Sequence, residues 1–366
     1  MHRPGSAWLL LAIPLFAFGR GKEPVAREPD SPSFQYRGRI DFTDRRKPRM
    51  IGAGAFVRFR FKGNACSVLL VDQNANGNRS YVSFELDGRY IGRIQLVPGR
   101  TRYVMAEGLD NAPHTVLLCK ATEAMIGWID FLGVECGELL SIQTSPERVI
   151  ECIGNSITCG TGLDASNIPC DSGAWYDQHN AYLGYGPLLA RALNADWVLS
   201  SVSGMGMIRN WNSPGPVMSD VYDKLYLNAG PGPLWDGGKT VPDLVTICLG
   251  TNDFSDGDGT VKRAPVDSAE FVERTIRFIR HIRNLYPDAQ LVCLNSPTVS
   301  GEKGEKLTSY LSTAVRSAKD KWKDKKINLF VFSRSYSAGC AGHPNRKQHE
   351  QMAGELEPFV KKVINW

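Results

Sequence analysis

The spacing of hydrophobic residues divides the chain into two parts. Between residues 34 and 140, apolar and polar side chains alternate in short runs rich in β-branched and aromatic residues, at 56–61, 66–71, 81–86 and 114–118. Turn-forming sequences such as Asp87-Gly88 separate these runs. Alternation with a period of two, broken by turns, is typical of half-buried antiparallel strands. This part is therefore predicted to be an antiparallel β-sandwich domain.

After residue 148 the pattern changes to apolar runs that alternate with helical periodicity. The apolar runs lie at 149–153, 197–199, 244–249, 291–294 and 329–332, and the helical stretches lie at 182–193, 268–286, 307–322 and 347–364. Strands that alternate with helices predict a parallel sheet with helices on both faces. In such a sheet, ligands bind at the carboxyl ends of the strands.

The first residues have the pattern of an export signal. A basic start is followed by an apolar run over 7–18 and a small-residue exit, so residues 1–19 are predicted to be a secretory signal peptide. Residues 20–33 are rich in Pro, Glu and Arg and are expected to form a linker. The apolar run is too short for a typical membrane span, so we expect a secreted or periplasmic protein without a stable membrane anchor.

Composition narrows the choice of partners. The chain has 366 residues, 42% of them hydrophobic, which is enough for two domains with a large core. Its net charge is only +5, and the Lys and Arg residues are scattered. Clustered basic residues would indicate a nucleic-acid surface, so no nucleic-acid partner is expected, and a monomer is predicted.

Nine cysteines are present, without a CxxC pair, so no zinc site is expected. Cys152, Cys248 and Cys293 lie in apolar strand-like runs and are expected to be buried free thiols. In an oxidising compartment, Cys159 and Cys170 are the best candidates for a disulfide, since they bracket one loop. An odd total leaves at least one thiol unpaired.

Four short motifs follow predicted strands and carry the candidate chemistry. They are 154–158 (GNSIT), 203–206 (SGMG), 250–253 (GTND) and 342–345 (GHPN). Covalent ester hydrolysis needs a nucleophile, a base and N–H donors for the developing oxyanion. Ser156 is predicted to be the nucleophile and His343 the base, with the Ser156 N–H, the Gly204 N–H and the Asn252 side-chain amide as donors.

Each motif also has an ordinary structural interpretation. Ser156 is a good helix N-cap, Gly204 a turn glycine, and Asn252 an Asx-turn residue. Asp253 is interpreted as holding its own loop by accepting backbone N–H groups, in preference to acting as an acid. Asn345 and Gln348 are expected to form a capping box at the start of the last helix.

His343 is also favoured by elimination among six histidines. His114 lies in the β domain and His281 in the middle of a predicted helix. His179 is interpreted as a surface or substrate contact, and His349 as a packing or capping residue in the last helix.

These motifs resemble the blocks of SGNH hydrolases, and the wider context resembles carbohydrate esterase family 2. The resemblance covers about residues 34–366 and includes the stretches 120–124 (KATEA), 203–210, 249–254 and 339–345. It implies a jelly-roll domain over 34–140 and an SGNH α/β/α domain over 148–366. The implied function is a secreted esterase that removes O-acetyl groups from xylan or glucomannan, with no metal or organic cofactor.

The resemblance also directs attention to aromatic residues that stack on sugar rings. Trp175, Tyr185, Trp211 and Trp235 are candidates, with core packing as the alternative for each.

Two positions depart from the family pattern. Asn155 stands where the family often has Asp, and Cys340 and Ala341 stand where many members carry an Asp before the catalytic His. The sequence therefore suggests a Ser156–His343 dyad, with a backbone carbonyl holding the imidazole tautomer. Two alternatives stay open: another SGNH acyl esterase or lipase, and a glycan-binding protein without catalysis.

Overall fold

The computed structural model describes residues 25–366 except 75–76, 143–145 and 238–239. The predicted signal peptide lies outside this range. The second half of the predicted linker is not a linker, because β1 (Val25–Arg27) pairs antiparallel with β10 (Trp128–Leu140). Arg27 donates a hydrogen bond to the Gly137 carbonyl at 2.7 Å. This short strand lacks the apolar alternation that predicts a strand, because charged residues follow its first two positions.

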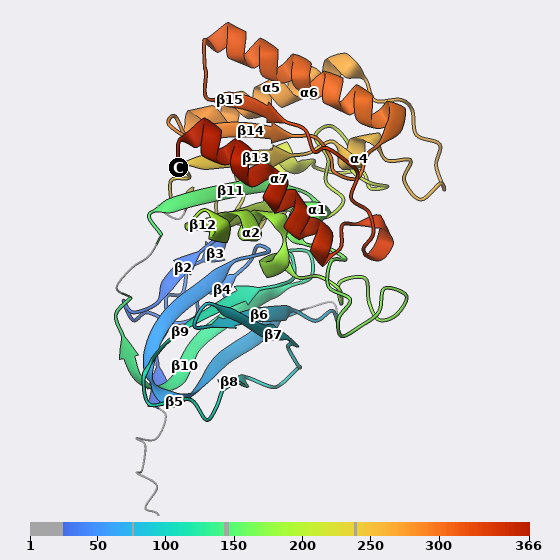
Figure 1. Ribbon diagram of the computed structural model, residues 1–366. Helices are drawn as coiled ribbons and strands as arrows, with labels where there is room; N and C mark the ends of the chain where they lie inside the picture. Colours follow the sequence, from blue (N-terminus) through green and yellow to red (C-terminus); the bar gives the residue numbers. More distant parts are fainter. Residues whose placement is uncertain (1–24, 75–76, 143–145, 238–239) are drawn as a thin grey trace, which may run out of the picture.

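The N-terminal domain is the expected antiparallel β structure. Its strands are β1, β2 (Gln35–Arg37), β3 (Ile40–Asp41), β4 (Arg49–Met50), β5 (Phe56–Gln73), β6 (Tyr81–Leu86), β7 (Arg89–Gln95), β8 (Arg102–Ala106), β9 (Pro113–Lys120) and β10. The two apolar runs at 56–61 and 66–71 form one 18-residue strand, β5. Because β5 pairs with β2, β8, β9 and β10, hydrogen bonds join all ten strands into one sheet that curls around the core (Figure 1).

The C-terminal domain is built on the expected parallel sheet. Its strands are β11 (Arg148–Gly154), β12 (Ala195–Ser201), β13 (Leu244–Cys248), β14 (Gln290–Leu294) and β15 (Ile327–Phe330). Their order is β12-β11-β13-β14-β15, and every neighbouring pair is parallel. The register sets Gly154 beside Ser201 and Cys248. The carboxyl ends of β11, β12 and β13 therefore lie level, and three of the four motifs begin there.

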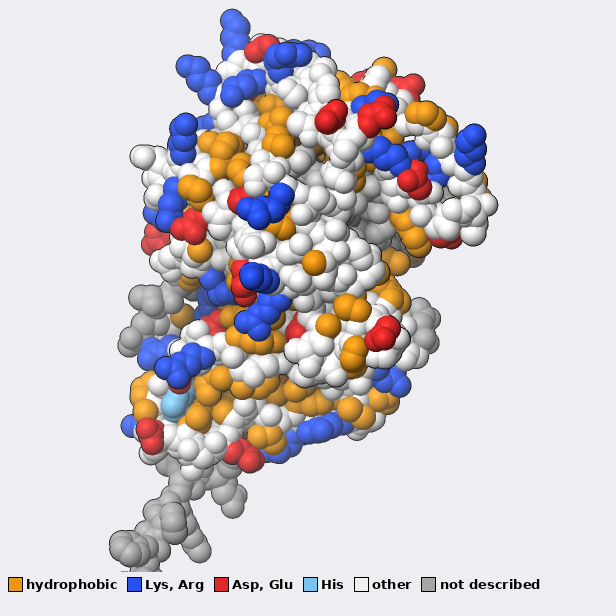
Figure 2. Space-filling view, turned by 45° about the vertical axis from the view of Figure 1, so that its right-hand side comes forward, with side chains coloured by type: hydrophobic (Ala, Val, Ile, Leu, Met, Phe, Trp, Pro, Cys, Tyr) orange, Lys and Arg blue, Asp and Glu red, His pale blue; other side chains and the backbone are white. Residues whose placement is uncertain are grey.

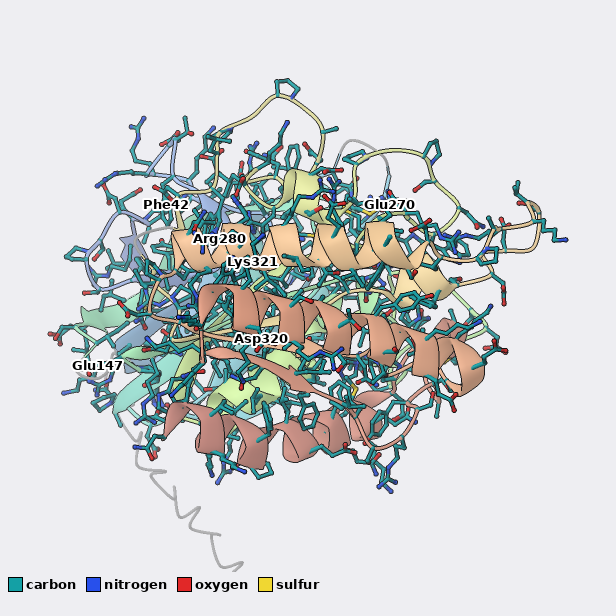
Figure 3. The ribbon with its side chains drawn as sticks, turned by 90° about the horizontal axis from the view of Figure 1, so that it is seen from above. Phe42, Glu147, Glu270, Arg280, Asp320 and Lys321 are labelled. Atoms are coloured by element: carbon teal, nitrogen blue, oxygen red, sulfur yellow. A yellow bond between two sulfur atoms is a disulfide. The ribbon has the colours of Figure 1, made fainter. Side chains whose placement is uncertain are left out.

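Helices cover both faces of this sheet. The long ones are α2 (Tyr185–Ala192), α5 (Ser268–Leu285), α6 (Gly301–Trp322) and α7 (Arg346–Ile364). Side chains of α2 and α7 share one core cluster with the sheet, and those of α5 and α6 share another. Figures 1 and 3 show α5 and α6 side by side, with Glu270 and Arg280 marking α5 and Asp320 and Lys321 the end of α6. The polar first turn of α6 explains why its start was predicted too late.

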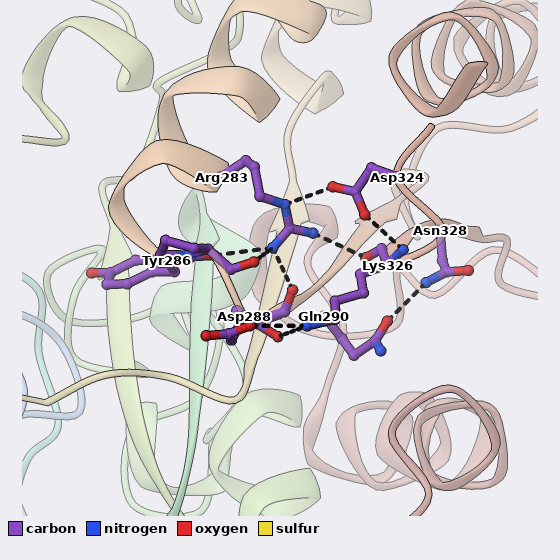
Figure 4. A network of polar contacts seen from close by, with 9 residues as sticks. Arg283, Tyr286, Asp288, Gln290, Asp324, Lys326 and Asn328 are labelled. Atoms are coloured by element: carbon purple, nitrogen blue, oxygen red, sulfur yellow. Dashed lines mark hydrogen bonds and ion pairs between the residues drawn. The ribbon is translucent and has the colours of Figure 1, made fainter. Parts of the chain in front are cut away.

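A polar network closes the amino ends of β14 and β15 (Figure 4). Arg283, at the end of α5, donates to Asp324 at 2.7 Å and to the Ala289 carbonyl at 2.6 Å. Asn328 donates to Gln290 across the two strands. This cluster lies at the end of the sheet opposite the four motifs. It holds α5, β14 and β15 together and does not contact the motifs.

The surface mixes charges of both signs. On the face drawn in Figure 2, Lys and Arg side chains are interspersed with Asp and Glu over both domains. Across the part of the chain that the structure describes, no helix is long and apolar enough to cross a membrane.

Candidate active site

Ser156 lies directly beyond the end of β11. It is the first residue of the short helix α1 (Ser156–Cys159), and Asn155 is the N-cap, whose side-chain oxygen accepts the Ile157 N–H at 3.2 Å. Asn155 therefore takes the capping role that was the alternative for Ser156. A first-turn N–H has no acceptor within its own helix. The Ser156 N–H and hydroxyl are both left for the site, and the residue is only 7% exposed.

His343 contacts Ser156 although it lies 187 residues further along the sequence. Its Nε2 lies 2.8 Å from the Ser156 Oγ, and its Nδ1 lies 3.2 Å from the Cys340 carbonyl oxygen. A carbonyl only accepts, so Nδ1 carries the proton and Nε2 is free to accept one from the serine hydroxyl. Burial lowers the pKa of His343 below its ordinary value, and the backbone hydrogen bonds oppose this shift.

The candidate oxyanion donors lie on the neighbouring strand ends. Gly204 follows β12 with φ +78°, in the left-handed region that favours glycine. Asn252 lies in α4 (Thr251–Phe254), is almost fully buried, and donates one side-chain N–H to the Met205 carbonyl at 2.8 Å. An amide nitrogen carries two hydrogens, so this bond orients Asn252 and leaves its second N–H for a ligand.

Asp253 clamps the loop that follows Gly204. Its carboxylate accepts the backbone N–H groups of Met207 at 2.9 Å, Ile208 at 2.7 Å and Arg209 at 3.1 Å. The sequence correctly predicted an Asp that accepts backbone N–H groups, but the loop it holds is the neighbouring one. With its oxygens committed here, Asp253 is a loop anchor.

Glu123, from the N-terminal domain, also reaches this loop. Its Oε2 accepts the Ser203 N–H at 2.7 Å, directly before Gly204, and the side chain is fully buried. Burial raises the pKa of Glu123 and lowers the pKa of the neighbouring Lys120 to about 7. The Lys120 ammonium donates to the Thr122 and Glu123 carbonyls at 2.8 Å. Only the family-like stretch 120–124 signalled this contact, since its partners lie 80 residues apart.

The four aromatic candidates separate into two pairs. Trp175 and Trp211 are exposed, at 51% and 45%, and the backbone N–H of Trp211 donates to the Gly204 carbonyl at 2.7 Å. Tyr185 is fully buried with its hydroxyl 3.0 Å from Thr158, so its prediction as a substrate contact is wrong.

The fourth candidate, Trp235, packs elsewhere. Its ring lies over the Arg39 guanidinium, 4.8 Å from the centroid, and lines a cavity of about 450 Å³ with Tyr36 and Phe42. The lining of that cavity contains none of the four motifs. For Trp235, therefore, the packing alternative describes the observed contacts.

Two other histidines lie near His343. His179 is fully buried, so it is not a surface residue, and its ring packs edge-on against Trp175 at 4.7 Å between centroids. Burial, aided by His343 and nearby cations, lowers the pKa of His179 well below its ordinary value. His349 accepts the Tyr185 N–H on Nδ1 at 3.0 Å, and burial lowers its pKa to about 3. His349 is a packing residue, as expected.

The predicted disulfide between Cys159 and Cys170 is wrong. Cys170 is bonded to Cys340, with 4.9 Å between their Cα atoms. Cys159 is a buried free thiol in α1, with its Sγ 3.2 Å from the Ser201 Oγ. Nearness in sequence favoured the wrong partner, because α1 turns Cys159 into the core. In the described part of the chain, no cluster of His, Cys, Asp or Glu could hold a metal ion.

Comparison with known families matches this arrangement. Residues 36–146 match the model "Carbohydrate esterase 2 N-terminal", and residues 152–351 match the model "GDSL-like Lipase/Acylhydrolase family". The chain therefore belongs to the GDSL-like acylhydrolases, a class of carboxylic ester hydrolases. Within that class it is a member of the family 2 carbohydrate esterases.

Individual relatives agree. The chain is 31% identical over 93% of its length to the cellulase/esterase CelE of Acetivibrio thermocellus, and it spans 40% of that longer protein. It is 27% identical to an acetylxylan esterase / glucomannan deacetylase of Cellvibrio japonicus, covering 92% of this chain and 90% of the relative. A family two carbohydrate esterase from Clostridium thermocellum, solved in complex with cellohexaose, superposes with a TM-score of 0.82 at 29% identity, over 91% of this chain and 99% of that one.

Proposed function

We propose that this protein is a secreted or periplasmic esterase that removes O-acetyl groups from plant polysaccharides such as xylan and glucomannan. The observation that carries the proposal is the pairing of the Ser156 Oγ with the His343 Nε2 at 2.8 Å beside a backbone acceptor for Nδ1. A nucleophile with a correctly oriented base is the minimum for covalent ester hydrolysis.

Catalysis takes place in two halves. The Ser156 Oγ attacks the acetyl carbonyl carbon while its proton passes to the His343 Nε2. The Ser156 N–H, the Gly204 N–H and the Asn252 side chain stabilise the oxyanion. The C–O bond to the sugar then breaks as His343 protonates the departing sugar oxygen, which leaves an acetyl-serine. Water, deprotonated by His343, attacks this ester, and acetate leaves as Ser156 regains its proton.

The base works as part of a dyad. The Cys340 carbonyl holds Nδ1 in its protonated form, which is the role of the acid in a Ser-His-Asp triad. Asp253 is occupied by three backbone N–H groups, so it is not that acid. If Asp253→Asn lost as much activity as His343→Ala with the fold intact, the dyad would be refuted.

The substrate class rests on the relatives and on the exposed aromatic residues. Related proteins are named acetylxylan esterase and glucomannan deacetylase. Trp175 and Trp211 are exposed on the segments beside His179 and Gly204, where indole faces can stack on sugar rings. We propose a monomer that needs no metal or organic cofactor.

The test is acetate release from acetylated glucomannan and acetylated xylan by the purified full-length chain. Ser156→Ala and His343→Ala should each abolish release while keeping the parent melting temperature. Ser309→Ala and His281→Ala, partly exposed positions on α6 and α5, are the matched controls and should keep full activity.

Two outcomes separate the alternatives. Efficient hydrolysis of long-chain aryl esters would favour a lipase-like acyl esterase, because a deacetylase pocket rejects chains beyond acetyl. Glycan binding without release of acetate from any ester would identify a binding protein with an inactive site.

A further inference from the structure

The residue whose carbonyl orients His343 is also half of the disulfide. Cys340 offers its carbonyl oxygen to the His343 Nδ1 at 3.2 Å, while its side chain is bonded to Cys170. Cys340 and Ala341 occupy the positions where a triad acid would be expected. We propose that the Cys170–Cys340 disulfide is the positioning element of the base, and that it replaces the missing acid by fixing a backbone acceptor. The inference rests on the proposed function.

The turn that carries this carbonyl is closed by one backbone hydrogen bond, from the His343 N–H to the Cys340 carbonyl at 3.1 Å. It is the single turn η3 (Cys340–Gly342), in which Ala341 has φ +51° and Gly342 has φ +71°. The left-handed region is unfavourable for a residue with a Cβ, such as Ala341. Ala341 and Gly342 are both exposed, so core packing does not compensate. We expect this turn to depend on outside anchors, as well as on its own hydrogen bond, for one stable conformation.

The partner loop provides that anchor, because it is itself held rigidly. The Gln178 side chain is buried and donates to the carbonyls of Pro169 at 2.9 Å and Ser172 at 3.0 Å, on both sides of Cys170. The disulfide therefore ties a strained turn to a fixed loop 170 residues away in sequence.

A second tie joins Cys340 to the segment of the nucleophile. The Cys340 N–H donates to the Gly162 carbonyl at 2.9 Å, a few residues beyond α1. A Cβ on Gly162 would lie 2.6 Å from the Cys340 carbonyl oxygen, so the two backbones pack directly. The Gly162 bond holds the Gly339–Cys340 peptide, the close approach of Gly162 confines the Cys340 carbonyl oxygen, and the disulfide fixes the Cys340 side chain. Together these contacts restrict rotation of the Cys340–Ala341 peptide.

The position of a backbone acceptor depends entirely on the conformation of its chain. A carboxylate acceptor can adjust through its own rotamers, but a carbonyl moves only with its peptide plane. When the Cys340 peptide is free to rotate, Nδ1 loses its acceptor, and the imidazole populates the tautomer with the proton on Nε2. That tautomer donates toward Ser156 and cannot accept the serine proton.

The test uses the full-length chain with Cys170→Ser, Cys340→Ser and the double variant. Each keeps the residue 340 carbonyl but lacks the disulfide. We expect kcat to fall about ten- to a hundredfold, less than the ~10⁴-fold loss known for a triad with the wrong tautomer, with KM within twofold. The three variants should lose the same amount, because both cysteines act through one bond.

A readout independent of acetate release is the His343 tautomer, measured from ¹⁵N shifts of its ring nitrogens and assigned with His343→Ala. The parent should show the proton on Nδ1, and the variants a mixture. Variants with the parent kcat and tautomer, whatever their melting temperature, would overturn the proposal and leave the disulfide a purely structural one. If the parent released no acetate, the proposed function would fail while the tautomer still tested the positioning.

Reduction provides a test that needs no mutant to fold. Cys170 is exposed, and the other seven cysteines are buried free thiols in the described structure. Dithiothreitol transfers two electrons to the S–S bond, giving two protein thiols and its own cyclic disulfide. Reduction should lower the parent kcat to the level of the double variant, reoxidation should restore it, and the double variant should not respond. An unchanged kcat in parent protein shown to be fully reduced would contradict the proposal.

Discussion

The His343 ring lies between a hydroxyl and a carbonyl, and among the residues that the structure describes no carboxylate bonds to it. Hydrogen bonds to Ser156 and Cys340 use both nitrogens. A carboxylate neighbour would raise the pKa of an imidazole by stabilising its charged form, whereas a neutral carbonyl does so far less. Burial therefore dominates, and the pKa of His343 is lowered.

This shift predicts the acid limb of the pH profile. Only neutral His343 accepts a proton, so kcat/KM should be constant above its pKa and fall tenfold per pH unit below it. Because the pKa lies below the ordinary 6.5, the midpoint should also lie below 6.5. Initial rates on an aryl acetate between pH 4.5 and 8 measure it. A midpoint above 6.5 would indicate a carboxylate partner and contradict the dyad.

A second residue-scale prediction concerns Asn252. Asn252→Ala removes an oxyanion donor already oriented by the Met205 carbonyl. We expect kcat to fall about 10²–10³-fold with little change in KM, since the interaction forms mainly in the transition state. Asn328→Ala, at the far end of the sheet, is the control and should keep the parent rate. A loss confined to KM would assign Asn252 to substrate binding instead.

The sequence could predict the pairing of Ser156 with His343 but not of Cys170 with Cys340. Strand ends in a parallel sheet share one edge, so the order of motifs along the chain places their side chains together. The disulfide joins two irregular loops, whose path no periodicity describes. For the same reason, Tyr185 could not be told from a surface aromatic residue, since its burial depends on the packing of α2 against α7.

At the scale of elements, the loop after β12 is held from two sides. Asp253 in α4 accepts backbone N–H groups from the carboxyl end of this loop. Glu123, in the turn after β9, accepts the Ser203 N–H at the start of the loop. Gly204 lies between these two anchors. In the sequence, only the family-like stretch 120–124 points to Glu123, because a contact between two domains leaves no local signal.

Glu123 lies in the N-terminal domain, and Glu123→Ala should therefore impair catalysis at a site in the C-terminal domain. It leaves the half-buried Ser203 N–H without its acceptor and lets Gly204 shift. We expect at least a tenfold fall in kcat, with KM nearly unchanged. Glu123→Gln keeps a carbonyl acceptor and should retain most of the activity, and Glu135→Ala, which removes a partly exposed ion pair between β10 and Arg102, should retain all of it. Equal losses in the Ala and Gln variants would show that the charge, and not the acceptor, matters.

At the scale of the whole molecule, the two domains share buried polar contacts. The Trp197 indole donates to the Gly54 carbonyl at 2.9 Å, and buried Asp196 pairs with Arg58 at 2.8 Å. The N-terminal domain thus completes the packing of edge strand β12 as well as the site. The change of hydrophobic pattern predicted where the two parts divide, but it carried no information on this interface.

Arg39 makes a further contact between the domains and gives the last prediction. Its guanidinium is fully buried and donates to the Ser200 Oγ at 3.0 Å and to the Tyr222 and Lys224 carbonyls at 2.9 Å. The Ser200 and Tyr222 hydroxyls in turn donate to the fully buried Glu151 carboxylate. Glu151 and Arg39 therefore stabilise each other's charge inside the protein, each from a different domain.

Arg39→Met should destabilise both domains together. It leaves two carbonyls without donors and the Glu151 charge uncompensated, which costs about 3–5 kcal/mol for a buried ion deprived of its partner. For a chain of this length that corresponds to a fall in melting temperature of roughly 5 °C, within a single calorimetric transition. Arg277→Met, which removes an exposed ion pair on α5, should shift the midpoint by less than about 1 °C. A single transition is expected because the shared buried charge network leaves neither domain a stable folded state of its own. Two separate transitions in the parent, or a change confined to one domain, would show that the interface does not couple the domains.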